Sequence, residues 1–239
     1  MASPKRILAL DASGGACSTA LWCQGAVVAR RFRQIVRGHA QVLVPMILET
    51  MADGGETFRR LDAIAVSVGP GAFTGIRIGL AAARGIGLAA GIPTVGVTTF
   101  AAVAEAVPES ERGGRALVVL LDTKRGDLFV QRFSTSRAPD DPPSIQTPTQ
   151  LVDGLTAGPT LLAGDGVAFI RPHLAASIFD VRYSTALGPV DAVNVAAVAA
   201  RSSAGAGVMP ARPLYLRAPD VRAAPSTESA ADERARLGD

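Results

Sequence analysis

Residues 67–79 have the sequence SVGPGAFTGIRIG, in which an apolar strand runs into a glycine-rich turn that opens a helix. Free N–H groups at a helix start favour anions, and glycines let a ligand approach the backbone. The segment lacks the Gly-Lys-Ser/Thr of a P-loop, and its third glycine comes one residue late for a dinucleotide fingerprint. Because of its glycines and free N–H groups, the segment could still form a nucleotide or anion loop, made of Gly69 and Gly71 with Asp11 and Ser13. A tight strand-to-helix turn would need the same glycines.

The helix predicted over residues 74–90, with Thr74 as its N-cap, repeats a small residue every fourth position. The repeat comprises Gly75, Gly79, Ala83, Gly87 and Gly91. Each glycine costs a helix roughly 1 kcal/mol relative to alanine, so several together need a structural reason. A stripe without side chains lets another backbone come close. That backbone could belong to the protein's own sheet or to the helix of a partner.

The segments around this helix predict an alternating α/β order. Three strands joined by tight turns should be antiparallel neighbours. Pro45 lies in the first helical pattern, so that helix either begins near Pro45 or is kinked there. The expected strands are 7–10, 18–24, 26–32, 61–68 and 93–98, and the expected helices are 39–51, 74–90 and 99–107.

The second half of the chain repeats the opening pattern. An apolar strand at 116–121 ends at Asp122 and is followed by a returning strand at 127–133, as the first strand ends at Asp11. A loop at 134–143, a strand at 161–164 before Asp165-Gly166 and a helix at 193–201 follow. We expect a first lobe over 1–108 and a second, reduced lobe over 109–217, after a polar boundary at 109–115, with the chain end packing back. Residues 218–239, rich in Ala, Pro, Ser and charge, predict a disordered tail. Two related lobes of this kind are the layout of the α/β actin-like, sugar-kinase and Hsp70 ATPase (ASKHA) fold.

Composition favours a cytoplasmic protein whose net charge produces only a weak electrostatic field. The 239 residues are 48% hydrophobic and carry a net charge of +3. The most basic segment has Arg30, Arg31, Arg33 and Arg37, which could contact RNA or form a solvated edge strand and loop. The two cysteines fit no zinc pattern or disulfide framework. We expect no signal peptide and no membrane span.

Several segments together resemble the TsaB (YeaZ) family. They are ILALDAS at 7–13, GHAQ at 38–41, the glycine-rich segment at 69–79, GIPTVGVTT at 91–99 and PLYLR at 213–217. The match is dense over the first hundred residues and returns briefly near the C-terminus. The resemblance implies a non-catalytic dimerisation subunit of the complex that transfers threonylcarbamoyl to N6 of adenosine 37 in tRNA. Its implied partners are a TsaD-type catalytic subunit, a TsaE-type ATPase and, through the complex, tRNA.

The resemblance also implies where this chain would bind TsaD. Members of the family pair with TsaD through a helical bundle built from the first two helices of each N-terminal lobe. Whether this chain forms a homodimer when the partner is absent is left undecided. A nucleotide such as ATP is implied only within the complex. Carried onto this chain, the partner-binding residues are His39, Val42, Leu43, Met46, Ile47, Thr74, Gly75, Ile76, Gly79, Leu80 and Ala83.

The residue types argue against catalysis by this chain alone. TsaD has a metal-binding His-x-x-x-His pair where this sequence has Thr99 and Val103, which argues against an M22-type metallopeptidase. Kinases of the superfamily usually follow the strand-end Asp with Gly, whereas Ala12-Ser13 follows Asp11 here. We therefore predict no catalytic residue and no metal site. A stand-alone small-molecule kinase or ATPase of the same fold is the alternative, and direct binding of tRNA by this chain alone is a further one.

Overall fold

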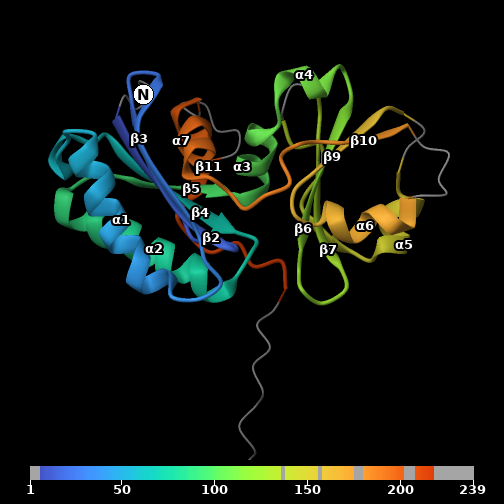
Figure 1. The fold of residues 1–239 in the computed structure, drawn as a ribbon, viewed down its shortest axis with the longest axis horizontal. Helices are drawn as coiled ribbons and strands as arrows, with labels where there is room; N and C mark the ends of the chain where they lie inside the picture. The colour runs from blue at the N-terminus through green and yellow to red at the C-terminus, as the bar shows by residue number, and fades with distance from the viewer. Residues whose placement is uncertain (1–5, 136–137, 156–157, 175–179, 202–207, 218–239) are drawn as a thin grey trace, which may run out of the picture.

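The computed structural model describes residues 6–135, 138–155, 158–174, 180–201 and 208–217, which form two sheets flanked by helices (Figure 1). Within these residues, the first sheet has the strand order β11-β5-β4-β1-β2-β3 and the second has β10-β9-β6-β7-β8. The strands of the first sheet are β1 (Arg6–Asp11), β2 (Ala16–Cys23), β3 (Ala26–Gln34), β4 (Ala63–Gly69), β5 (Thr94–Thr98) and β11 (Val208–Pro210). Those of the second are β6 (Ala116–Asp122), β7 (Leu128–Phe133), β8 (Ser144–Gln146), β9 (Thr160–Ala163) and β10 (Val181–Tyr183).

The two sheets share one topology. In the first, β1 pairs antiparallel with β2 and parallel with β4. In the second, β6 pairs antiparallel with β7 and parallel with β9. Asp11 and Asp122 end the corresponding strands β1 and β6. The two related lobes predicted from this repeat are therefore confirmed.

The helices cover both faces of the first sheet because alternate strand residues point to opposite sides. Leu8, Leu10 and Ile64 pack with α1 (His39–Asp53) and α2 (Phe73–Ala90). Ile7 and Ala9 join a cluster with α3 (Thr99–Ala106) and α7 (Ala192–Arg201). That second cluster also contains one face of the second sheet, so a common core links the lobes. The other face of the second sheet packs on α5 (Pro148–Asp153) and α6 (Val167–Leu174).

The chain crosses between the lobes more than once. The predicted boundary at 109–115 contains a short helix, α4 (Glu109–Arg112). A short 3-10 helix, η1 (Phe58–Arg60), lies earlier in the chain, between α1 and β4. Beyond the second sheet, α7 packs on β1 and β2, and β11 pairs with β5. The range predicted for the second lobe, 109–217, thus includes two elements that pack with the first sheet. The predicted tail at 218–239 lies outside the described residues.

One alternative for the helices is excluded, and one local expectation was wrong. α1 begins at His39 and includes Pro45 in its interior, so the proline does not start the helix. α2 begins at Phe73 after Ala72, without a side-chain cap, and Thr74 lies in its first turn. By length and composition α2 is also apolar enough to cross a membrane. Its glycine side is buried on the sheet, which is typical of a core helix.

Candidate functional site

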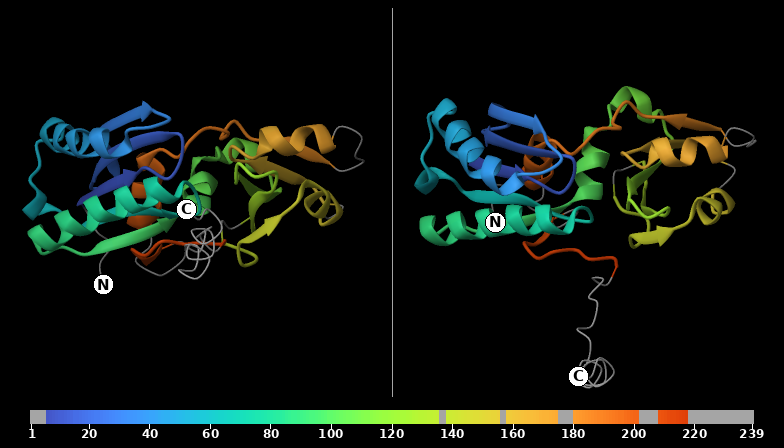
Figure 2. Two further views of the ribbon diagram at one scale, coloured as in Figure 1. Left: turned by 90° about the horizontal axis from the view of Figure 1, so that it is seen from below. Right: turned by 60° about the horizontal axis from the view of Figure 1, so that its bottom comes forward.

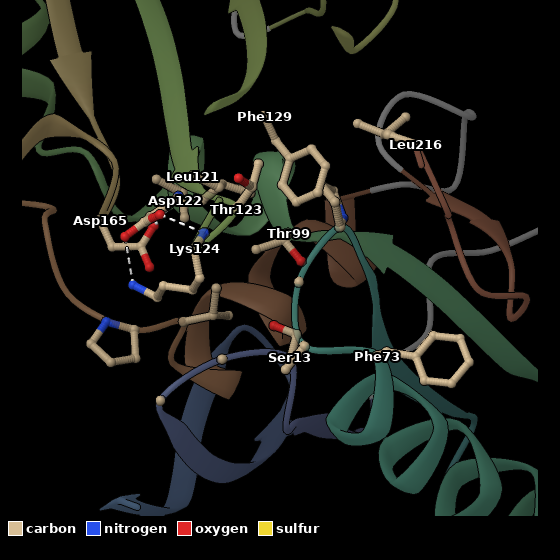
Figure 3. A pocket seen from close by; sticks show the side chains of 18 of the residues that line it. Ser13, Phe73, Thr99, Leu121, Asp122, Thr123, Lys124, Phe129, Asp165 and Leu216 are labelled. Carbon is tan, nitrogen blue, oxygen red and sulfur yellow. Dashed lines mark hydrogen bonds and ion pairs between the residues drawn. The ribbon is translucent and has the colours of Figure 1, made fainter. Parts of the chain in front are cut away.

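A cleft of about 630 Å³ lies between the two lobes (Figure 3). The turn after β1, at residues 13–15, and the turn between β4 and α2, at residues 70–73, form its first wall. The turn after β6, at residues 121–125, and Asp165 form the second wall. Residues 214–217 close one side. Each wall therefore comes from the same place in the two related lobes, at the end of β1 or of β6.

The glycine-rich turn is shaped by the strand beside it. A Cβ atom at Gly71 would overlap the carbonyl oxygen of Ser13, and one at Gly75 would overlap that of Ala12. The backbone N–H of Ala72 donates to the Ser13 carbonyl at 2.7 Å. These contacts account for the glycines by close backbone packing, the second alternative that the sequence left open.

Asp11 lies beneath the cleft wall instead of lining it. Its side chain is fully buried, and Ser13 donates to it from its hydroxyl at 2.7 Å and from its backbone N–H at 3.3 Å. Burial raises the pKa of Asp11 to about 6. Gly69 is also absent from the cleft lining, whereas Ser13 and Gly71 belong to it. The structure thus brings two of the four predicted loop residues to the cleft.

The second wall carries a compact ionic cluster, of which the sequence singled out only Asp122, at the end of the repeated strand. The ammonium group of Lys124 lies 2.7 Å from the Asp122 carboxylate, and the backbone N–H of Asp122 donates to Asp165 at 3.0 Å. Burial raises the pKa of Asp165. Partial burial acts to raise that of Asp122, but the hydrogen bonds from Lys124 outweigh it and lower this pKa. The Asp-Gly pair after the predicted strand at 161–164 was the only sequence signal for Asp165.

Residues 208–217, here called the C-terminal strap, tie the lobes together along one side of the cleft. The strap begins as β11, and the backbone N–H of Leu214 donates to the Val68 carbonyl at 2.8 Å. Tyr215 stacks on Phe73, and Arg217 forms an ion pair with Asp127 of the second lobe. The segment PLYLR at 213–217 is therefore an interlobe connection.

Most of the residues predicted to bind a partner are buried inside this chain, and this part of the prediction needs correction. Their side chains, or their Cα atoms in the case of glycine, pack between the two helices and the first sheet, where a partner cannot reach them. The buried residues are Leu43, Met46, Ile47, Gly75, Ile76, Gly79, Leu80 and Ala83. Of the rest, Val42 is half-buried, Thr74 is exposed, and the His39 ring lies 3.0 Å from the Gly14 carbonyl.

The outward sides of the same helices carry a different apolar set. On α1, Val44 is 51% exposed and Leu48 is 57% exposed, one turn apart. On α2, Leu88 is 88% exposed, and Ala81 and Gly85 are also exposed. The two helices lie beside each other on one face of the first sheet (Figure 1). We call these five residues the docking face.

Two of the four arginines of the basic segment, both on β3, form ion pairs within the chain. Arg30 forms an ion pair with Asp191, and Arg31 forms ion pairs with Glu49 and Asp53. This pairing favours the solvated edge strand over an RNA site at these positions.

Two lobes of matching topology around a shared cleft define a protein of the ASKHA class. A family model described as "TsaD: tRNA N6-adenosine threonylcarbamoyltransferase" matches residues 33–141. The Escherichia coli tRNA threonylcarbamoyladenosine biosynthesis protein TsaB is 36% identical over 124 residues, 52% of this chain and 53% of that protein. The chain thus matches about half the length of this curated relative. An uncharacterized protein of Mycobacterium tuberculosis is 31% identical over 199 residues, 82% of this chain and 83% of that protein.

A solved structure is similar over nearly the whole chain. YeaZ from Pseudomonas aeruginosa has a TM-score of 0.73 at 25% identity, covering 90% of this chain and 100% of that one. The chain belongs to the TsaB (YeaZ) family.

Proposed function

We propose that this chain is a non-catalytic subunit in tRNA threonylcarbamoyladenosine biosynthesis that binds and stabilises a TsaD-type catalytic subunit through α1 and α2. The docking face is the observation that carries the proposal. Val44, Leu48 and Leu88 expose large apolar side chains on the outer sides of two helices that contact each other, and exposed apolar patches mark interaction sites. The name of the Escherichia coli relative supports the pathway.

The buried residues beneath the docking face have a supporting role in this proposal. Leu43 and Ile47 hold α1 on the sheet, and Gly75 and Gly79 let α2 lie close to β1 and β4. The helices are therefore fixed before a partner arrives. A preformed face loses less conformational entropy on association than a flexible one, which favours tight pairing.

The cleft supports the non-catalytic part of the proposal. Thr99 and Val103 line it at the positions that correspond to the His pair of TsaD, and neither has an imidazole. Asp11, the residue that a kinase of this class would direct at a metal-bound phosphate, is covered by Ser13. We infer from the family alone the remaining features, namely a TsaE-type ATPase and tRNA as members of the complex, a cytoplasmic location and a homodimer when the partner is absent.

Co-purification with TsaD from the same organism, measured by size-exclusion chromatography with light scattering, tests the proposal. We expect a stable one-to-one complex from the unmodified chain and none from the double variant Val44→Asp, Leu48→Asp. The control is Val28→Asp, which changes the same residue type at 47% exposure on β3, and it should pair normally. Thermal unfolding should show that all variants fold.

Three results would count against the proposal. A chain that stays alone beside TsaD would exclude the partner role, and a double variant that pairs normally would exclude this face. ATP hydrolysis by the purified chain, in the absence of TsaD and TsaE, would support the stand-alone kinase or ATPase instead.

A further inference from the structure

An exposed aromatic pair, Phe73 and Tyr215, lies where α2 meets the C-terminal strap, and both residues line the interlobe cleft. Figure 3 shows Phe73 at the edge of this cleft. The rings of Phe73 and Tyr215 stack with centroids 5.4 Å apart and planes 29° apart, yet they remain 42% and 40% exposed. The Arg77 guanidinium lies 3.8 Å from the centre of the Phe73 ring, and its Nε donates to the Tyr215 hydroxyl at 3.0 Å. The hydrogen bond from the neighbouring Leu214 to Val68 holds the strap in place. The pair is thus an aromatic platform that is held by several contacts and partly open to solvent.

The chain around this platform is basic and lacks acidic residues over long stretches. The sequence contains no Asp or Glu between residues 63 and 104, which span β4 to α3, and none in the C-terminal strap. The strap-facing flank of α2 and the strap itself contribute Arg77, Arg84, Arg212 and Arg217. Arg84 donates to the Ala211 carbonyl, so it lies against the strap. Arg217 is paired with Asp127, and the others keep their positive charge on this flank without an acidic neighbour from either segment.

This surface lies on a different side of α2 from the docking face and adjoins it, since Arg84 is one helical turn from Leu88. Phe73, Arg77 and Arg84 lie on the side of α2 that contacts the strap, as their bonds to Tyr215 and Ala211 show. The half-buried Ile78 and Ala82, at other positions around the helix, pack into the cluster that contains α1. Figure 2 shows the strap running along α2 on the side away from α1. Phe73 begins α2 at the cleft rim, whereas Leu88 of the docking face lies near the other end of the helix.

We propose that the platform binds RNA by stacking an unpaired base on the Phe73–Tyr215 pair, while the arginines of α2 and the strap attract the phosphates. Exposed aromatic rings beside arginines are the groups that bind single-stranded nucleic acid, because every base has a stacking face and every nucleotide a negative charge. An unpaired segment is required, since bases inside a duplex cannot reach a ring. That this RNA is the tRNA of the complex rests on the proposed function above.

The test measures binding of the full chain, alone and mixed with TsaD, to two RNAs of equal length. One is a stem-loop with 2-aminopurine in its unpaired loop, and the other is a blunt duplex. We expect preference for the stem-loop, a 2-aminopurine fluorescence change on binding, and weaker binding as salt rises. Tyr215→Ala should weaken stem-loop binding about tenfold and abolish the fluorescence change.

Two variants serve as matched controls. Tyr215→Phe keeps the ring and loses only the hydroxyl that binds Arg77, so it should retain the fluorescence change. Tyr183→Ala removes an exposed tyrosine on the second lobe, which also has an arginine, Arg171, over its ring at 4.4 Å. It should bind the stem-loop like the unmodified chain.

Each contrary result overturns the inference. These results are equal affinity for duplex and stem-loop, an equal loss in Tyr183→Ala, or no stem-loop binding with or without TsaD. Tyr215-dependent binding of poly-glutamate in place of the RNA would assign the platform to an acidic protein segment. Light scattering of the same mixtures reports pairing with TsaD separately. If the unmodified chain does not form a complex with TsaD, the subunit role is refuted. The RNA measurement on the chain alone would still test whether the platform binds RNA.

Discussion

Replacing Asp11 with asparagine should raise the free energy of unfolding relative to that of the unmodified chain as the pH rises from acidic to neutral. Asp11 is fully buried at the end of β1, with Ser13 as a hydrogen-bond donor to both of its oxygens. Burial disfavours the charged carboxylate and raises its pKa from 3.8 to about 6. Asparagine keeps one acceptor oxygen and cannot ionise.

The size of the effect follows from linkage between ionisation and folding. Below about pH 4 the Asp11 carboxyl is protonated in both states, so it adds no pH dependence. Between about pH 4 and about pH 6 the folded chain still holds a proton that the unfolded chain has released, so the free energy of unfolding falls as pH rises. Each tenfold change in the ionisation equilibrium is about 1.4 kcal/mol, so the rise of the pKa from 3.8 to about 6 corresponds to about 3 kcal/mol.

Urea unfolding of both proteins from about pH 4 to about pH 7.5 measures this difference. The comparison cancels the contributions of other groups, such as Asp122 and Asp127, whose pKa values are lowered and which act in the opposite direction. The loss of one acceptor should shift the asparagine variant by a constant amount of about 1 kcal/mol at all pH values. The variant should then gain about 3 kcal/mol on the unmodified chain across the window. Parallel curves would refute the assigned pKa.

Three further predictions test the packing of the first lobe. Gly75→Ala should lower the free energy of unfolding by about 1–3 kcal/mol, because the added methyl group meets the backbone after β1. Gly85→Ala in the same helix has open space around the methyl group and should raise the free energy of unfolding by about 1 kcal/mol. Chemical unfolding compares the two variants, and equal effects would contradict the close approach at Gly75. Ser18→Ala should cost about 1–3 kcal/mol in the same assay, because the Ser18 hydroxyl is buried and bonds to backbone groups at the start of α7, and a neutral result would be inconsistent with those bonds. Iodoacetamide labelling followed by mass spectrometry should leave Cys17 unmodified in the native protein, since burial raises its pKa to about 11, and should label the half-buried Cys23 first; the reverse order would show that the core is open there.

Sequence alone gives the order of elements in the first lobe because its signals are local. Apolar strands such as β1 end at turn residues, and α2 has a sustained helical pattern between a glycine-rich turn and Gly91. The repeat of a strand ending in Asp predicts the second sheet for the same reason. The pairing of β11 with β5 has no such signal, since a three-residue strand contributes little pattern and its partner lies far away in sequence.

The candidate sites were harder to predict because the sequence does not say which side of a helix faces the core. Both sides of α1 are apolar, so Leu43 and Ile47 look as suitable for a partner as Val44 and Leu48. Burial separates them, and the proposed partner site uses the outer set. The stacking of Tyr215 on Phe73 joins residues more than a hundred positions apart, which no local pattern encodes.

The composition of α2 is explained by three different neighbours around one helix. Its glycine side packs against the backbone after β1, where even a methyl group at Gly75 would collide. Its arginine side meets the strap, where Arg77 and Arg84 bond to Tyr215 and Ala211. Its remaining outer side carries Ala81, Gly85 and Leu88, which are exposed in this chain. A helix exposed to water on that side would be expected to carry charges, as surface helices do. The absence of charge there supports the proposed partner site, and the arginines on the strap side support the proposed RNA site. The two proposals can be tested separately, at Val44 and Leu48 for the partner and at Tyr215 for the RNA.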